Sequence, residues 1–159
     1  MKKPWGPWVS TAARLVLGAV MLVAGALKIN DPEAAVQAVR AYNLLPSALE
    51  TPVGWGLPFL EIAIGLLLVV GFGVRAAALA AGIFLLVFIA AVSSAWVRGL
   101  AIDCGCFGGG GQVAPGQTQY LQEILRDVGL LVLAGWLYIS PTSKFALESD
   151  PYVSTGVTA

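Results

Sequence analysis

The stretch "AAALAAGIFLLVFIAAVSSAWV", residues 76–97, contains no charged residue and is long enough to cross a lipid bilayer. A spanning helix needs about 20 mostly apolar residues to traverse roughly 30 Å of hydrocarbon. The composition of the whole chain agrees with this interpretation, because 58% of its 159 residues are hydrophobic and only 11% are charged. Ordinary soluble domains contain about a quarter charged residues. The sequence therefore predicts an integral membrane protein.

Three further apolar stretches predict additional spans, at residues 9–29, 53–72 and 121–139. The polar first turns of the last stretch indicate that its entry end faces protein or water rather than lipid. We expect residues 9–29 to be retained and not removed as a signal peptide, because Lys28 follows without a small-residue cleavage site. The predicted fold class is all-α. It is an integral membrane four-helix bundle over residues 1–139 with both termini on one side, followed by a flexible tail over residues 140–159.

The basic residues predict the orientation of this bundle in the plasma membrane. Lys2 and Lys3 favour a cytoplasmic N-terminus, which also places the C-terminus in the cytoplasm and the loops at 30–52 and 98–120 outside. In the first of these loops Asp31 and Pro32 form a typical helix start. The helix that follows is expected at the membrane surface. Its apolar face would consist of Ala34, Val36, Val39 and Tyr42.

The second outer loop contains the only two cysteines of the chain, Cys104 and Cys106, in "IDCGCFGGGG" at residues 102–111. Disulfides form and persist outside the cytoplasm, and Gly105 between the cysteines permits a tight turn. Closing a ring over one residue is expected to strain the disulfide geometry. Strained, exposed disulfides tend to be labile or catalytic, whereas a structural disulfide gains most from closing a long loop. The pattern favours a redox pair, with inert buried thiols as the alternative.

The residues around the pair are candidates for supporting roles. The charge of Asp103 opposes thiolate formation and that of Arg98 favours it, and the sequence does not decide which dominates. Phe107 and Gly108 complete the motif.

Two ionisable residues are predicted within the membrane. Glu61 and Arg126 each lie several residues into a span that enters from outside, at a depth of roughly 12 Å. Equal depth suggests an ion pair between them, with Glu123 as a competing partner of Arg126 on its own helix. Such a pair either pins the helices together or tunes the thiols and a proton path beneath the loop. Lys28 and Arg14, near span ends, are expected to extend to the interfaces.

The composition also excludes several function classes. The chain contains no histidine, which removes the commonest general base and the commonest zinc ligand. Two cysteines alone cannot complete a four-ligand zinc site or hold an iron–sulfur cluster. The net charge of zero provides no electrostatic footprint for nucleic acid.

Residues 11–139 resemble the MauE branch of the DoxX-like membrane proteins. The resemblance depends on "RLVLGAVMLVAGALKINDP" at 14–32, "AYNLLP" at 41–46, "LPFLEIAIGLLLVVG" at 57–71, Arg98-Gly99 and above all "DCGCFG" at 103–108. It implies a four-helix membrane protein associated with maturation of methylamine dehydrogenase, whose small subunit carries many disulfides. It further implies a thioredoxin-like partner and a role for Cys104 and Cys106 in thiol–disulfide exchange.

The resulting hypothesis is a membrane component of a thiol–disulfide relay, a thiol–disulfide oxidoreductase component if it is an enzyme. Cys104 and Cys106 would exchange with a thioredoxin-like carrier or a disulfide-bearing client protein, and a quinone is a candidate electron partner. Two alternatives remain open. One is a non-catalytic accessory subunit of a membrane complex, and the other is a thiolate site that binds or transports Cu(I) or Hg(II).

Overall fold

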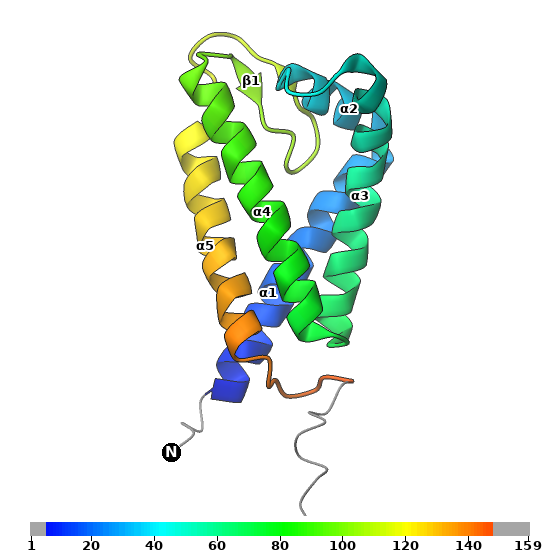
Figure 1. The fold of residues 1–159 in the computed structure, drawn as a ribbon, viewed down its shortest axis with the longest axis vertical. Coiled ribbons are helices and arrows are strands. Elements are labelled where there is room, and N and C mark those ends of the chain that lie inside the picture. Colours follow the sequence, from blue (N-terminus) through cyan, green and yellow to red (C-terminus); the bar gives the residue numbers. More distant parts are fainter. Residues whose placement is uncertain (1–5, 148–159) are drawn as a thin grey trace, which may run out of the picture.

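The computed structural model describes residues 6–147, and its long helices run between the same two ends of the molecule at a tilt to one another (Figure 1). A short helix and a small strand pair cover one end of these helices. The elements in chain order are α1 (Gly6–Asn30), α2 (Pro32–Ala41), α3 (Ser47–Val70), α4 (Val74–Val97), β1 (Ile102–Asp103), β2 (Gly111–Gln112) and α5 (Tyr120–Ile139). The predicted all-α fold is confirmed, and the antiparallel β1–β2 pair is a local addition within the cysteine loop.

Within residues 6–147, α1, α3 and α4 are long and apolar enough to cross a membrane. These helices identify a membrane protein. Helix α5 coincides with the fourth predicted span but carries Glu123, Arg126 and Asp127 in its first half. A membrane-spanning position for α5 therefore stays a prediction.

Glycines bring α1 and α3 into close contact. A Cβ atom on Gly18 would lie 3.1 Å from the carbonyl oxygen of Gly65, and one on Gly65 would lie 3.0 Å from that of Gly18. Small residues allow the backbones of membrane helices to approach closely where lipid offers no hydrophobic driving force. The pairing of α1 with α3 is thus built into the sequence of both helices.

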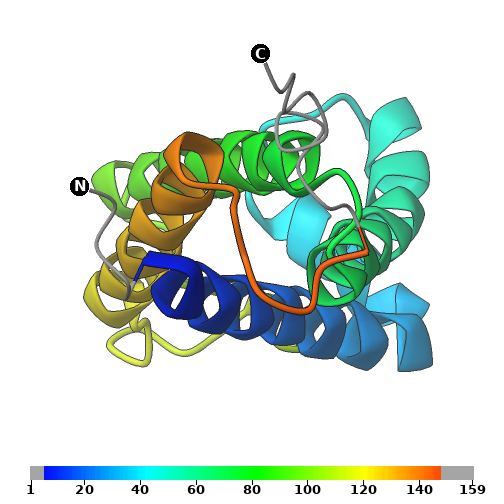
Figure 2. The ribbon, with the colours of Figure 1, turned by 90° about the horizontal axis from the view of Figure 1, so that it is seen from below.

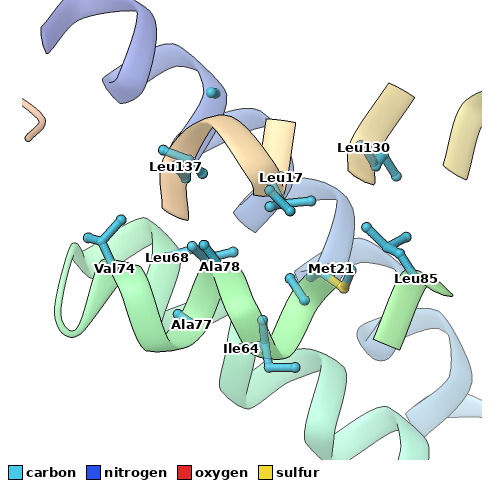
Figure 3. Packing of buried hydrophobic residues seen from close by; sticks show 13 residues of the cluster. Leu17, Met21, Ile64, Leu68, Val74, Ala77, Ala78, Leu85, Leu130 and Leu137 are labelled. Atoms are coloured by element: carbon cyan, nitrogen blue, oxygen red, sulfur yellow. The ribbon is translucent and has the colours of Figure 1, made fainter. Parts of the chain in front are cut away.

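The core lies where α1, α3, α4 and α5 meet (Figure 3). Leu17, Leu68 and Leu137 are completely buried, and the small residues Ala77 and Ala78 let α4 pack against them. Large apolar residues also lie on the outer surface of the helices. That surface suits a lipid environment, because lipid tails are as apolar as leucine.

The end of the bundle opposite the cysteine loop is closed by residues 140–147, which run across it from the end of α5 (Figure 2). Arg14 is buried and donates hydrogen bonds to the carbonyls of Lys144 and Phe145 at 3.4 and 3.3 Å. The Arg14 guanidinium reaches the end of the bundle beside Gly71, and residues 140–147 bury it there. Its expected position at the membrane interface stays a prediction. The flexibility of residues 140–159 stays a prediction, and residues 148–159 lie outside the described part of the chain.

Helix α2 confirms the predicted helix in the first loop. Asp31 caps it, accepting a hydrogen bond from the Ala34 amide at 3.0 Å. The helix packs on α3, where a Cβ atom on Gly54 would lie 2.7 Å from the Cα of Val36. Figure 1 shows α2 and β1 at the same end of the bundle. The two loops predicted to share one side therefore do so.

Candidate functional site

Cys104 and Cys106 lie directly after β1, and their Sγ atoms are in contact. Their Cα atoms are 5.4 Å apart, which is inside the range for a disulfide. Both residues are buried, with exposed fractions of 5% and 8%. The expectation of an exposed pair is therefore wrong. The physical reason is that α2 lies over the cysteine loop, which the sequence pattern did not indicate.

The contact between α2 and the loop depends on glycine at two positions. Gly105 has φ +68°, and a Cβ atom there would lie 2.6 Å from the Cβ of Ala38. Gly110 has φ +108°, and its Cβ atom would lie 2.5 Å from the same atom. Any side chain at Gly105 would therefore meet both an unfavourable backbone conformation and the face of α2.

Tyrosine hydroxyls hold the cysteine loop from two sides. Tyr42, which follows α2, donates a hydrogen bond to the carbonyl of Cys104 at 3.3 Å. Tyr120, at the start of α5, donates to the carbonyl of Leu100 and accepts from the amide of Ile102 at 3.3 Å. Burial, and secondarily the negative charge of Glu123, raises the pKa of Tyr42 well above its ordinary value. The hydroxyl therefore keeps its proton and remains a donor to Cys104. Sequence reasoning placed Tyr42 only on the apolar face of the first-loop helix, and its position relative to the cysteines could not be read from the pattern.

The flanking residues of the motif take different positions. Asp103 accepts a hydrogen bond from the Gly105 amide at 3.1 Å and so supports the turn. Arg98 donates to the carbonyls of Tyr42 and Asn43, and thus fixes the segment after α2 to the end of α4. Both residues therefore shape the backbone around the pair.

The last two residues of the motif face α5 and α1. The guanidinium of Arg126 lies 4.8 Å from the centre of the Phe107 ring. Gly108 has φ +83°, and a Cβ atom there would lie 3.4 Å from the Cβ of Leu27.

An ion pair lies beneath the loop. Lys28 Nζ on α1 is 2.5 Å from Glu61 Oε1 on α3, and both side chains are buried. The predicted Glu61–Arg126 pair is wrong, because Arg126 pairs with its neighbour Asp127 at 2.9 Å. The expectation that Lys28 extends to the interface is also wrong, since the chain turns into α2 immediately after α1 and covers it. The signal that could have found the pair is the opposite charge of Lys28 and Glu61 on consecutive spans.

Two small cavities connect this ion pair with the sulfurs. One, of about 30 Å³, is lined by Lys28, Glu61, Phe88, Cys106, Arg126 and Asp127, among others. The other, also of about 30 Å³, is lined by Lys28, Tyr42, Phe88, Cys104 and Gly105, among others. Each has room for water, which needs at least about 10–15 Å³. Lys28 lines both cavities, so one cation lies in a cavity with each of the two cysteines.

Two further features bear on metals and cofactors. Ligand-type atoms of Asp103, Cys104 and Glu123 lie within 4.8 Å of one another, but the Cys104 sulfur is already in contact with that of Cys106, and we assign no metal to this cluster. A larger apolar groove of about 570 Å³ runs between α3 and α4 and reaches Tyr42 and Phe88. Its size is within the range of small-molecule sites.

Comparison with known proteins identifies the family of the chain. Residues 6–140 match the family model described as "Methylamine utilisation protein MauE". The chain is 37% identical over 105 residues to the methylamine utilization protein MauE of Paracoccus denitrificans, which covers 65% of this chain and 56% of that protein. It is 34% identical over 101 residues to the MauE protein of Methylophilus methylotrophus, covering 63% of this chain and 53% of that protein. The aligned regions thus span little more than half the length of these curated relatives.

No solved structure matches the chain. The family match nevertheless covers α1 to α5 with the cysteine loop between α4 and α5. This chain belongs to the MauE family of membrane proteins.

Proposed function

We propose that the chain is an accessory membrane protein of methylamine utilisation, acting as a component of a thiol–disulfide relay. The names of its relatives support the process, and the cysteine pair supports the chemistry. The observation that carries the proposal is the contact between the Cys104 and Cys106 sulfurs, held at one end of a bundle whose described residues contain no other sulfur nucleophile.

The proposed reaction is thiol–disulfide exchange in two steps. A thiolate of the partner attacks Cys104, the bond between the two cysteines breaks, and the Cys106 sulfur leaves as a thiolate. The second partner thiol then attacks the mixed disulfide, which gives an oxidised partner and a dithiol at Cys104 and Cys106. Two electrons pass from the partner to the pair, and the reverse sequence reduces the disulfide of a client protein and re-forms the Cys104–Cys106 bond.

Access to the buried pair requires the contact between α2 and the loop to open. The partner of suitable chemistry is a thioredoxin-like carrier or a disulfide-bearing client outside the cytoplasm, with the cysteine loop on that side of the membrane. A quinone is the alternative electron partner. It would occupy the groove between α3 and α4, which is apolar and reaches Tyr42, the donor to Cys104.

The test is to trap the partner. In a Cys106→Ser variant, Cys104 can attack a partner disulfide but no second sulfur resolves the product, so a mixed disulfide should accumulate. Non-reducing gels should then show a reductant-sensitive adduct on Cys106→Ser that is missing from the Cys104→Ser/Cys106→Ser control. If Cys106→Ser forms no adduct and the double variant supports full methylamine-dependent growth, the relay is contradicted and the non-catalytic accessory subunit is favoured. If Cu(I) protects both thiols from an alkylating reagent, the soft-metal site is favoured instead.

A further inference from the structure

The cavity beneath Cys106 contains a buried ion pair whose carboxylate is only partly hydrogen-bonded. Lys28 and Glu61 are both buried, yet the second carboxylate oxygen of Glu61, Oε2, has no hydrogen-bond partner among the described residues. A buried charged group without full hydrogen bonding is costly and is a functional candidate in a membrane protein. Because Cys106 lines the same cavity, the carboxylate and the sulfur face one cation.

Disulfide opening creates a charge at this place. The leaving Cys106 sulfur is negative, and it forms in a site that is 8% exposed. An isolated anion is unfavourable there, whereas a nearby lysine stabilises a thiolate. Lys28 is the candidate cation because it lines both the cavity that reaches Cys106 and the cavity that reaches Cys104.

We propose that Lys28 exchanges its ion-pair partner between the Glu61 carboxylate and the Cys106 thiolate as the cysteine pair opens and closes. This inference rests on the proposed thiol–disulfide function and names the groups that balance its charge. When the Cys104–Cys106 bond breaks and the Cys106 thiolate forms, the proton that the attacking partner thiol gives up passes through the cavity to Glu61. The buried site then holds one cation and one anion before and after the step. Closing the disulfide releases the partner sulfur as a thiolate, and the proton returns from Glu61 to that thiolate.

The other charged groups around the pair are already engaged or lie elsewhere. On α5, Arg126 and Asp127 pair with each other, and the Arg126 guanidinium also lies over Phe107. Glu123, Asp103 and Tyr42 face Cys104, and their negative or neutral groups supply no cation. Helix α4 contributes apolar side chains to the cavity. Lys28 therefore has no rival on the described elements that pack against Cys106, apart from the paired Arg126.

The test uses full-length protein in membranes with Cys106 as its single thiol, in a Cys104→Ser background. The measurement is the pH midpoint of iodoacetamide alkylation. Lys28→Met should raise the midpoint by about one pH unit, which is about a tenfold slower reaction at neutral pH. Glu61→Gln removes the competing anion and should lower the midpoint. Lys28→Arg keeps the cation and should leave the midpoint at the value of the Cys104→Ser background. Arg14→Met removes a buried cation from the far end of the same helix and should leave the midpoint unchanged.

The opposite signs of the two main variants separate this role from a structural one. If the ion pair only holds α1 to α3, Lys28→Met and Glu61→Gln will move the midpoint in the same direction or not at all, and either result overturns the proposal. A shift in Arg14→Met equal to that in Lys28→Met also overturns it. If Lys28→Met does not accumulate in membranes, the double variant Lys28→Met/Glu61→Gln is used instead. Its midpoint must then be higher than that of Glu61→Gln alone. Partner trapping on Cys104 is measured in a separate experiment. If no partner is trapped but the midpoints shift as expected, the proposed function is contradicted and the role of Lys28 is not.

Discussion

A Cβ atom on Gly105 would lie 2.6 Å from the Cβ of Ala38, so helix α2 rests directly on the Cys-Gly-Cys turn. We predict that Gly105→Ala lowers the free energy of unfolding by about 1–3 kcal/mol, the usual cost of overpacking, beyond the cost of its positive φ. The measurement is the thermal unfolding midpoint of the detergent-solubilised protein.

Gly99→Ala is the matched control for this prediction. Gly99 has a similar φ of +66° but nothing within 4 Å of its Cβ position. The control should therefore show only the cost of backbone strain. Adding Ala38→Gly to Gly105→Ala should recover part of the lost stability. Equal destabilisation by the two alanine variants would contradict a role for α2 packing.

The buried Lys28–Glu61 pair gives a second prediction, on stability. Lys28→Met leaves a buried carboxylate without its cation and should destabilise the protein by about 3–5 kcal/mol. Lys28→Met/Glu61→Gln leaves no unpaired charge and should be the more stable of the two variants. A double-mutant cycle of unfolding free energies measures the coupling. An additive cycle would show that the two side chains do not interact.

The sequence was sufficient to predict the long helices, because a long apolar run identifies a span without knowledge of what the helix packs against. The end of α1, the cap at Asp31 and the shared side of the two loops follow from local rules of this kind. The "DCGCFG" motif likewise identified the cysteine site without any knowledge of packing.

The packing of α2 over the cysteine loop could not be predicted from the sequence. Burial of the cysteines and of Lys28 both result from α2 folding back across the end of the bundle. That packing depends on Ala38 fitting two glycines more than 60 residues away along the chain, which no local pattern encodes. Equal depth suggested Glu61 and Arg126 as partners, but depth does not determine which helices are neighbours, and α1 packs against α3 through Gly18 and Gly65.

Tyr42 gives a prediction on pH. Its pKa in the folded state is raised, chiefly by burial, whereas in the unfolded state it is about 10. The unfolded protein therefore loses this proton first, and stability contributed by Tyr42 is present below about pH 10 and falls as the pH rises above it. Tyr42→Phe should cost about 1 kcal/mol at pH 8, where the hydrogen bond to Cys104 is lost, and less at pH 11.

The measurement for Tyr42 is the unfolding midpoint of wild type and Tyr42→Phe at both pH values. Tyr138→Phe, at a half-exposed residue near the other end of the bundle, is the control and should show no convergence with wild type. A constant difference between wild type and Tyr42→Phe from pH 8 to pH 11 would contradict the burial of the hydroxyl.

The proposed outside position of the cysteine loop leads to the last prediction. Direct labelling of Cys104 and Cys106 would confuse sidedness with burial, because both are sheltered beneath α2. We therefore expect a cleaner result from single cysteines placed at exposed positions in a Cys104→Ser/Cys106→Ser background. Gln117 lies in the cysteine loop, and Phe72 lies in the turn between α3 and α4 at the opposite end. A membrane-impermeant maleimide added to intact cells should label Gln117→Cys, and should label Phe72→Cys only after the membrane is permeabilised. The reverse pattern would place the pair in the cytoplasm, where thiols are kept reduced, and would contradict exchange with a carrier outside the cell.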